Sequence, residues 1–281
     1  MAKYVPDSKT QRWIVIAPIR SDRPDEIHPE TKKSVCAFCY GSEQLTPPEV
    51  FRIGPGEPNK PGWHVRVVPN KYPITDIHEV IIHSPNCDHD FEELPLKHVI
   101  LILQAYRERY NAHRQEGRVL IFCNHGVAAG ASLSHPHSQL VVVPRQISLD
   151  ILSREPITNV IEEEGEFVVY CPEFSQWPYE VWIAPKIPDG VFGTISDSGI
   201  ATLAQLLQKT LIRLTKKAQE PALKKIHPNE PFSYNFYISH DTNWYLRIIP
   251  RLIHRAGFEL GTGLNVNIVD PVSASEELKR V

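Results

Sequence analysis

The chain contains an internal repeat, in which the same sequence patterns follow one another in the same order. HEVIIHS at residues 78–84 resembles YEVWIAP at residues 179–185, and each is followed by a helical pattern and by two further strand-like segments. The last segment of each copy ends in a Pro-Arg pair, at Pro144 and Arg145 and at Pro250 and Arg251. The repeat predicts a duplicated fold of strands and helices, with one copy in residues 1–145 and the other in residues 146–281.

Each copy includes one amphipathic segment long enough for a major helix. The first runs from about Glu93 to Gln115, and the second runs to about Lys217 with Ser196 as a candidate cap. Apolar side chains recur in them every three or four residues. These positions are Val99, Leu103, Tyr106 and Tyr110 in the first copy and Ile200, Leu203, Leu207, Leu211 and Leu214 in the second.

A pair of histidines distinguishes the first copy from the second. In ASLSHPHSQLVVVPR, residues 131–145, a strand is expected to begin near His135, which places His135, His137 and Gln139 on one face. A cluster that only closes a strand end is the alternative. Counting back from the Pro-Arg pairs sets Asn243 opposite His137 and Asp241 opposite His135. This asymmetry favours a functional site in the first copy.

Composition limits the class of partner. The 281 residues are 42% apolar, which is enough for a sizeable core, and the formal net charge of −3 argues against a general nucleic-acid or anionic-membrane binder. The sequence begins without an apolar leader and contains no apolar run of the ~20 residues that cross a bilayer. We therefore expect a cytoplasmic protein that acts on a small partner.

The five cysteines indicate metal ligation rather than a disulfide framework. Cys36 and Cys39 form a CxxC knuckle, for which a redox pair and a chance occurrence are the alternatives, and no thioredoxin-like context is visible. Cys123 and Cys171 lie in apolar strand patterns and are expected to be buried. We favour a closed structural zinc site whose ligands are Cys36, Cys39, Cys87 and His135, with His89 competing for the third place.

The loop NHGVAAGASLS, residues 124–134, has the composition of an anion-binding turn. Gly126 and Gly130 permit positive φ, and successive backbone N–H groups in such a loop can bind a phosphate. An ordinary connection between strands is the alternative. A phosphate held there would lie against His137, with Ser132 and Gln139 as further donors. Upstream, Arg20 and Arg23 follow a strand, where they could contact phosphate or base, although exposed arginines are commonly only solvated.

Five motifs in order resemble one known family. WIVIAPIRSDRP, CAFCYGSEQLTPPEV, WHVRVVPNKYP, NHGVAAGASLSHPHSQ and IIPRLIHRAGFELGTG together look like the galactose-1-phosphate uridylyltransferase family of the histidine-triad superfamily. The resemblance extends from about Trp13 to Asn267. It implies an α+β, duplicated histidine-triad fold of two half-barrel antiparallel sheets with packed helices, and a homodimer.

The resemblance also implies roles for individual residues. His137 would be the nucleophile, His135 a zinc ligand with the cysteine pair, and Cys87 would stand where the family has a further zinc histidine. The remaining matched positions are Gln139 and Ser132 for the transferred phosphoryl group, Arg20, Arg23, Asn70 and Asn124 for the nucleotide, and Glu259 for the hexose. Gly130 of the glycine loop is a further candidate for substrate binding. Ser138 departs from the family's usual glycine, and GFELGTG resembles a branch that includes ADP-glucose phosphorylase-like proteins.

These residues predict nucleotidyl transfer by double displacement through a nucleotidyl-His137. The principal hypothesis is a UDP-glucose:hexose-1-phosphate uridylyltransferase-like enzyme of galactose metabolism, with zinc as cofactor. A nucleotide-sugar phosphorylase, such as ADP-glucose phosphorylase, is the enzymatic alternative. A non-catalytic, nucleotide-binding zinc protein is a second alternative, because the second copy carries Asn243 and Tyr245 where the family's second metal site has histidines.

Overall fold

The computed structural model describes residues 2–10, 12–23, 35–150, 152–188, 190–225, 231–240 and 242–281. The chain divides into two compact units. Unit 1 comprises residues 1–123, 132–152 and 192–194, and unit 2 comprises residues 124–131, 153–191 and 195–281. Within the described ranges, every helix is too short or too polar to cross a membrane.

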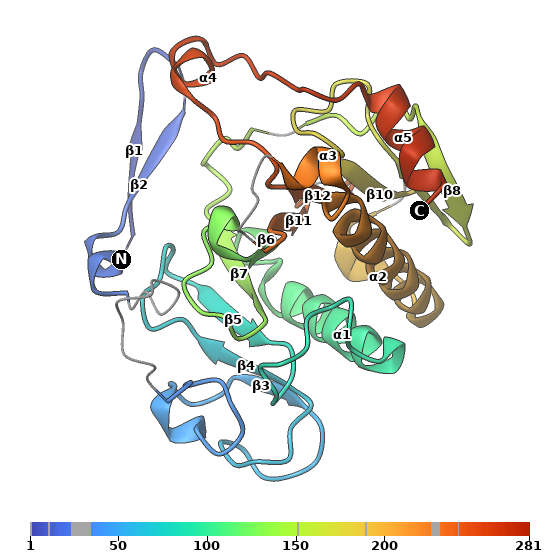
Figure 1. Ribbon diagram of the computed structural model, residues 1–281. Helices are drawn as coiled ribbons and strands as arrows, with labels where there is room; N and C mark the ends of the chain where they lie inside the picture. The colour runs from blue at the N-terminus through green and yellow to red at the C-terminus, as the bar shows by residue number, and fades with distance from the viewer. Residues whose placement is uncertain are drawn as a thin grey trace. The chain divides into compact units, whose positions relative to one another are not determined.

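Unit 1 is built on an antiparallel sheet, and its described strands follow the order β3-β4-β5-β7-β6. The strands are β3 (Phe51–Ile53), β4 (Val65–Pro69), β5 (His78–Ile82), β6 (Arg118–His125), whose last two residues belong to unit 2, and β7 (His137–Val143). A separate hairpin pairs β1 (Lys3–Pro6) with β2 (Trp13–Ile16), and short 3₁₀ turns lie at Pro18–Asp22, Glu43–Leu45 and Phe192–Thr194. Figure 1 places these strands in blue to green.

Unit 2 repeats this arrangement, since its described strands follow the order β8-β9-β10-β12-β11. They are β8 (Val160–Glu164), β9 (Phe167–Tyr170), β10 (Val181–Pro185), β11 (Tyr234–Ile238) and β12 (Leu246–Pro250). In both units the last two strands of the sequence exchange places in the sheet, and the long helix comes after the third strand. The predicted duplicated α+β fold is confirmed, whereas the predicted division at residue 145 stays a prediction.

The long helix of unit 1, α1 (Leu96–His113), packs against β3, β4 and β7. It begins directly after Pro95, whose fixed φ suits a helix start but cannot continue a helix from the preceding chain. All four apolar positions predicted from the spacing are buried. The helix therefore covers one face of the sheet with its apolar side (Figure 1).

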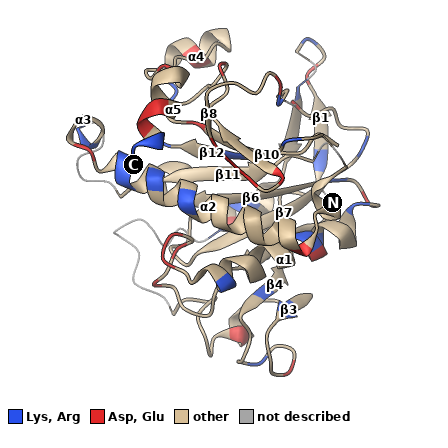
Figure 2. Cartoon of the chain, turned by 90° about the vertical axis from the view of Figure 1, so that its right-hand side faces the viewer, with Lys and Arg blue, Asp and Glu red and all other residues tan. Residues whose placement is uncertain are grey.

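The long helix of unit 2, α2 (Asp197–Ala218), is capped as predicted, because the Ser196 hydroxyl accepts the Gly199 N–H at 3.0 Å. Its predicted apolar stripe is buried against β9 and β10. The polar side carries a row of cations (Figure 2), of which Lys209 and Arg213 bind Glu162 of β8. The shorter helices of this unit are α3 (Pro221–Lys224), α4 (Gly257–Thr262) and α5 (Pro271–Lys279), and α5 packs on α2 and β8.

The register of β7 determines which side chains share a face. Ile82 of β5 pairs with His137, and Val80 pairs with Gln139. Residues two apart on a strand point to the same side, so His137 and Gln139 lie together as predicted. The strand begins at His137 rather than near His135, because Pro136 precedes it without an N–H to donate, although its carbonyl oxygen accepts the His83 N–H at 3.2 Å.

Candidate active site

A cavity of about 230 Å³ opens beside β7, and its lining comes entirely from unit 1. Five of the predicted site residues line it: His137, Gln139, Ser132, Arg23 and Asn70. The rest of the lining consists of Lys71, Thr46 and an apolar wall of Ala37, Phe38, Leu45, Pro47, Val68, Pro69, Tyr72, Val80 and Leu133. A cavity with an apolar wall and a few polar groups on one side suits a ligand that has an apolar ring and a charged group.

The His137 imidazole is held in one tautomer. Its Nδ1 lies 2.8 Å from the carbonyl oxygen of His135, which can only accept, so Nδ1 carries the proton and Nε2 keeps the lone pair. Phe38 contacts the ring edge-on, with 5.5 Å between centroids. Burial lowers the pKa of His137 to about 4, against the opposing hydrogen bond to the His135 carbonyl oxygen, and the charge of Arg23 adds to the lowering. The ring is therefore neutral at physiological pH.

Gln139 is hydrogen-bonded on its carbonyl side. Its Oε1 lies 3.0 Å from Nε2 of His78 and 3.5 Å from Nδ2 of Asn70. Its side-chain Nε2 therefore faces away from both residues, and Gln139 lines the cavity. His78 was missed by sequence reasoning, although its position two residues before Val80 on the neighbouring strand would place it on the same face as Gln139.

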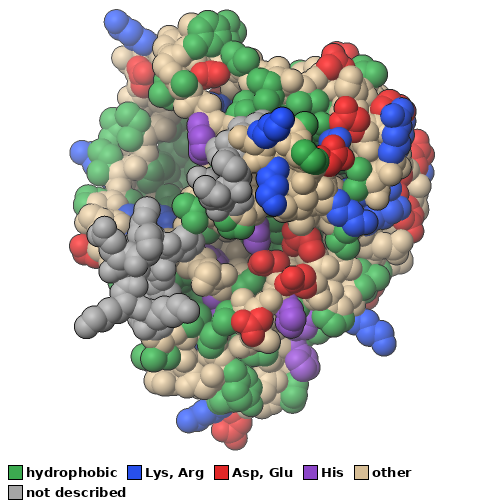
Figure 3. Space-filling view, in the orientation of Figure 1, with side chains coloured by type: hydrophobic (Ala, Val, Ile, Leu, Met, Phe, Trp, Pro, Cys, Tyr) green, Lys and Arg blue, Asp and Glu red, His purple; other side chains and the backbone are tan. Residues whose placement is uncertain are grey.

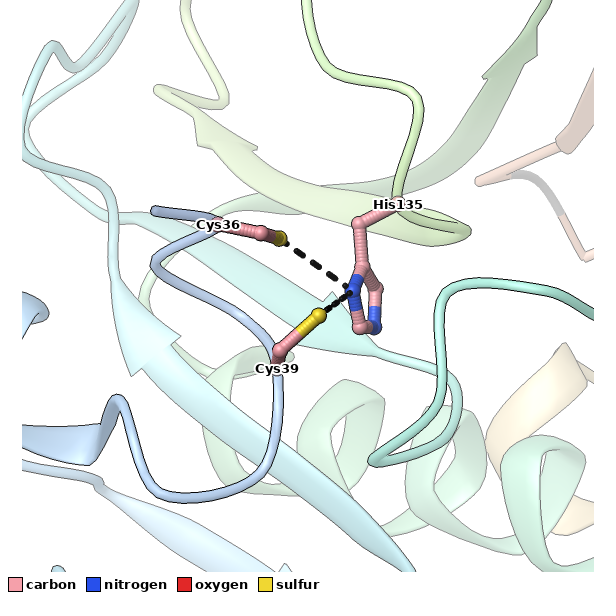
Figure 4. A group of neighbouring side chains, drawn as sticks. All are labelled: Cys36, Cys39 and His135. Atoms are coloured by element: carbon pink, nitrogen blue, oxygen red, sulfur yellow. Dashed lines mark hydrogen bonds between the residues drawn. The ribbon is translucent and has the colours of Figure 1, made fainter. Parts of the chain in front are cut away.

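Cys36, Cys39 and His135 form the metal-ligand group found among the described residues, with their ligand atoms all within 4.8 Å of one another (Figure 4). Nδ1 of His135 lies 3.4 Å from the Cys36 sulfur and 3.6 Å from the Cys39 sulfur. Its Nε2 donates to the Ser84 carbonyl oxygen at 2.9 Å. This outer hydrogen bond fixes the tautomer that presents the Nδ1 lone pair to the two sulfurs.

The two candidates for a further ligand are placed differently. Cys87 is an exposed thiol that lies outside the three-residue group. Burial raises the pKa of Cys39, and the neighbouring Cys36 and Cys87 thiols raise it further, so Cys87 is close to Cys39. His89 instead pairs with Glu93, with Nδ1 3.7 Å from the carboxylate, and its side chain is 53% exposed. Cys87 is the better placed of the two, and its role as a ligand stays a prediction.

The donor set fits zinc. Two thiols and one imidazole, with the second imidazole nitrogen hydrogen-bonded to a backbone carbonyl, are the ligand chemistry of structural zinc sites. The two cysteines that sequence analysis set aside, Cys123 and Cys171, are buried as predicted.

The cysteine knuckle is tied to the strand that carries His137. The Tyr40 N–H donates to the Pro85 carbonyl oxygen at 3.1 Å, close to the Ser84 carbonyl that accepts from His135. Phe38, inside the knuckle, contacts the rings of both His135 and His137 and packs on a buried apolar cluster. A metal bound here would therefore fix one wall of the cavity.

Ser138, the residue that departs from the family pattern, faces the opposite side of β7. Its hydroxyl is bound by Tyr106 of α1 and lies 2.8 Å from Nε2 of His83. All three side chains are buried. A hydroxyl in this interior position needs such partners, so the serine is accommodated by a polar network behind the cavity rather than by contact with it.

The remaining predicted site residues do not line the cavity. Arg20 lies in unit 1 and donates to the Tyr72 carbonyl oxygen at 2.8 Å, next to Asn70 and Lys71. Asn124 and Gly130 belong to unit 2, where Asn235 donates to the Asn124 side-chain oxygen at 2.9 Å. Gly126 and Gly130 have positive φ, as predicted, but whether their loop binds a phosphate stays a prediction.

Glu259 also lies in unit 2, at the start of α4. Its Oε2 accepts the Ala256 N–H at 2.9 Å, which caps the helix. Its predicted contact with a hexose stays a prediction.

Known proteins resemble this chain over nearly its whole length. ADP-glucose phosphorylase of Arabidopsis thaliana is 30% identical to it, over 98% of this chain and 92% of that protein. The family model of the galactose-1-phosphate uridyl transferase N-terminal domain matches residues 74–143, which include β5, α1 and β7. The chain belongs to the galactose-1-phosphate uridylyltransferase family. This membership makes it an enzyme of the nucleotidyltransferase or phosphorylase kind.

A second relative and a solved structure extend the comparison. Galactose-1-phosphate uridylyltransferase of Thermotoga maritima is 24% identical, over 96% of this chain and 95% of that protein. The crystal structure of an ADP-glucose phosphorylase from Arabidopsis thaliana with bound ADP-glucose superposes with a TM-score of 0.75 and 27% identity, covering 100% of this chain and 99% of that one. This chain and the ADP-glucose phosphorylase thus share one fold over their whole lengths.

Proposed function

We propose that the protein transfers a nucleoside monophosphate from a nucleotide sugar to a second phosphate compound, through a covalent intermediate on His137. The observation that carries the proposal is the state of this imidazole. It is neutral, it lines a cavity, and the hydrogen bond from Nδ1 leaves the Nε2 lone pair as the nucleophile. Family membership supports the same chemistry.

In the first step, Nε2 attacks the α-phosphorus of the nucleotide sugar. An N–P bond forms, and the bond from phosphorus to the bridging oxygen breaks, releasing the sugar 1-phosphate with that electron pair. The imidazole gains positive charge as the bond forms, and the His135 carbonyl oxygen on Nδ1–H stabilises it. A second phosphate compound then attacks the same phosphorus and restores the neutral ring, which gives ping-pong kinetics.

Polar groups on one side of the cavity would stabilise the negative charge of the phosphoryl group in this step. Charge on the non-bridging oxygens would be met by Arg23 and by the amide of Gln139, with Ser132 as a further donor. Such preorganised donors act most strongly where water is excluded. The apolar wall around Phe38 and Val68 offers a place for the base and ribose.

Zinc is proposed as an architectural cofactor. Cys36, Cys39 and His135 would hold it, with Cys87 as the proposed fourth ligand. Bound zinc would supply folding energy by closing the knuckle against residues 84–87, and the chain's own residues would carry the chemistry.

The second phosphate compound is a sugar 1-phosphate in the main proposal and inorganic phosphate in the alternative. The uridylyltransferase relatives and the family model favour the first. The alternative rests on the Arabidopsis thaliana ADP-glucose phosphorylase and on its structure with ADP-glucose. We propose uridylyl transfer from UDP-glucose to a hexose 1-phosphate, with release of glucose 1-phosphate, as the main activity.

The experiment is a substrate matrix. UDP-glucose and ADP-glucose are each incubated with purified protein and with either galactose 1-phosphate or inorganic phosphate, and the nucleotide products are separated. The proposal predicts a new nucleotide sugar from UDP-glucose and galactose 1-phosphate. A nucleoside diphosphate formed only with inorganic phosphate would establish the phosphorylase instead. Absence of turnover in every combination would favour the non-catalytic reading.

A homodimer is proposed as well. Phe258, Leu260 and Leu264, in and just after α4, are each more than half exposed. Figure 3 shows apolar side chains at the top of the molecule, where Figure 1 places α4. Exposed apolar surface of this kind marks interaction sites. Sedimentation velocity that gives a monomer at micromolar concentration would contradict the dimer.

A further inference from the structure

His78 is a buried titratable group that contacts Gln139, one of the proposed phosphoryl donors, and the mechanism above does not use it. The residue is 4% exposed and lies at the start of β5. On the face of the sheet that it shares with Val80, its ring reaches Gln139 on the neighbouring strand. Because buried polar atoms are normally hydrogen-bonded, both ring nitrogens of His78 are expected to have partners.

A backbone N–H determines the tautomer of this ring. The Ile74 N–H donates to Nδ1 of His78 at 2.9 Å, so Nδ1 must carry a lone pair and Nε2 must carry the proton. If the ring were doubly protonated, the Nδ1–H group and the Ile74 N–H would both be donors in the same contact, which is repulsive. Burial, assisted by the charges of Arg20 and Arg23, lowers the pKa of His78 to about 4 despite the opposing hydrogen bond to Gln139. The neutral Nε2–H tautomer is thus the state at physiological pH.

The fixed tautomer in turn fixes the amide of Gln139. Nε2–H of His78 can only donate, so the Gln139 atom 3.0 Å away must be the carbonyl oxygen and not the amide nitrogen. A flipped amide would place two donors in contact. The two N–H bonds of Gln139 are consequently directed away from His78.

Asn70 reinforces this orientation by the same rule. The Tyr72 N–H donates to Oδ1 of Asn70 at 2.8 Å, which turns Nδ2 toward Gln139 Oε1 at 3.5 Å. Asn70 Nδ2 also lies 3.1 Å from Nε2 of His78, but both groups are donors, so that contact is only proximity. Two backbone N–H groups of the turn before β5 therefore set the orientation of two side-chain amides.

We propose that His78 is a positioning residue that holds the amide N–H groups of Gln139 toward the phosphoryl group during transfer. The inference rests on the proposed function, because it assigns a use to Gln139 in that reaction. A free glutamine amide can rotate by half a turn and present its oxygen to a phosphate oxygen, which would be repulsive. His78 removes that state and so contributes preorganisation rather than a contact with substrate.

A matched pair of substitutions tests the role. The amide of Gln placed at position 78 reaches roughly where Nε2 lies and can donate, whereas Asn reaches only to the position of Nδ1, where it can still accept from Ile74. The expected result is that His78→Gln keeps kcat within about fivefold, while His78→Asn lowers kcat by about 10- to 100-fold with KM nearly unchanged, since loss of one preorganised donor costs up to 10²–10³ elsewhere. Thermal unfolding verifies that both variants fold.

The same substitutions are repeated in a Gln139→Met background, where no amide remains to be oriented. There His78→Asn is expected to lower kcat by less than about threefold. An equal loss in both backgrounds, or equal activity of His78→Gln and His78→Asn, would overturn the positioning role.

A readout without turnover separates this inference from the proposed function. In protein labelled with ¹⁵N-histidine, His78 is expected as the neutral Nε2–H tautomer between pH 6 and 8. A protonated ring or the Nδ1–H tautomer refutes the inference even if transfer is observed. If the tautomer is as expected but no nucleotide is transferred in any substrate combination, the proposed function fails and the orientation of Gln139 still stands.

Discussion

Where unit 1 has Gln139 beside a cavity, unit 2 has Tyr245 in a packed aromatic cluster. The Tyr245 ring stacks on Trp182 with 3.9 Å between centroids, and Trp182 also contacts Tyr170 and Phe174. Counted from the two Pro-Arg pairs, Tyr245 stands at the repeat position of Gln139. The same strand order thus carries a polar cavity in one copy and a packed aromatic cluster in the other, so the site depends on a few side chains at one strand end and not on the fold.

A second pair of positions is matched in sequence but not in structure. The aligned segments HEVIIHS and YEVWIAP set Glu79 opposite Glu180, and each is buried and bound by an arginine. Glu79 is bound by Arg109 and by His113 of α1, whereas Glu180 is bound by Arg247 of β12 and by Trp182. Glu79 thus faces the long helix of its unit, whereas Glu180 faces the side of the sheet that carries Trp182 and Arg247, and each charge is paired where it is buried.

The largest difference in kcat is expected between alanine substitutions of His137 and of its counterpart Asn243. His137→Ala removes the nucleophile and should lower kcat by a factor on the order of 10⁴ or more, as loss of a nucleophile does in other enzymes. Asn243→Ala in unit 2 should leave kcat within about twofold. The measurement is steady-state transfer with both variants at matched folded concentration. Comparable activity of the two variants would remove the asymmetry on which the mechanism stands.

Metal removal should affect unit 1 through stability. Cys36→Ser deletes one proposed zinc ligand and is expected to abolish bound zinc and to lower the free energy of unfolding by several kcal/mol, on the order of a structural metal site. Cys171→Ala, a buried cysteine outside the metal-ligand group, serves as the control and should retain zinc. Zinc content by atomic absorption and urea denaturation provide the readouts. Full zinc content in Cys36→Ser would exclude this cysteine as a ligand.

The aromatic cluster of unit 2 should matter for folding and not for catalysis. Tyr245→Ala leaves a hole beside Trp182 and is expected to cost about 3–5 kcal/mol of unfolding free energy while kcat changes by less than about threefold. Tyr40→Ala is the matched control, because Tyr40 is 61% exposed and its substitution should cost less than about 0.5 kcal/mol. A large loss of kcat in folded Tyr245→Ala would mean that unit 2 contributes to the reaction at this position.

The smallest effect concerns the two buried carboxylates and pH. Burial tends to raise the pKa of Glu79, but hydrogen bonds from His113 and Arg109 outweigh this and lower it, and the bond to Glu79 in turn raises the pKa of His113. The stability from Glu79 is lost as pH falls below about 4.5 through its folded pKa, and that from His113 is lost as pH rises above about 6.5 through its folded pKa. The stabilisation of this cluster should therefore be largest between these values.

Comparing Glu79→Gln with the unsubstituted protein measures that stabilisation. The difference in unfolding free energy is expected to be about 1–3 kcal/mol near pH 5.5 and to shrink toward both pH 3.5 and pH 8. Glu180→Gln, whose carboxylate partners are Arg247 and Trp182 rather than a histidine, should show no decrease on the alkaline side. A Glu79→Gln difference that is constant across the range would contradict the assignment.

Local pattern predicted much of the architecture and part of the site. The apolar spacing through Val99 and Tyr106 located α1, and the repeat predicted the matching sheets. The CxxC pair and His135 come together as proposed, since metal-ligand chemistry restricts which residue types can meet. The spacing of apolar residues and the residue types of a metal site can both be recognised from the sequence alone.

Hydrogen-bond orientation could not be predicted in the same way. The tautomer of His78 depends on the Ile74 N–H, and the resulting orientation of Gln139 depends on strand register, which no single motif contains. Similarly, HPHSQ displays Ser138 beside the histidines, yet strand alternation turns it toward Tyr106. The positions of Asn124, Gly130 and Glu259 in unit 2 also depend on long-range folding.

Trapping the intermediate tests the central claim most directly. The protein is mixed with a nucleotide sugar that carries ³²P at the α-phosphorus, without an acceptor, then quenched in alkali and digested. The account predicts label on the peptide that contains His137, acid-labile, released by a sugar 1-phosphate, retained in Asn243→Ala and absent in His137→Ala. Turnover without protein-bound label, or label that persists in His137→Ala, would contradict it.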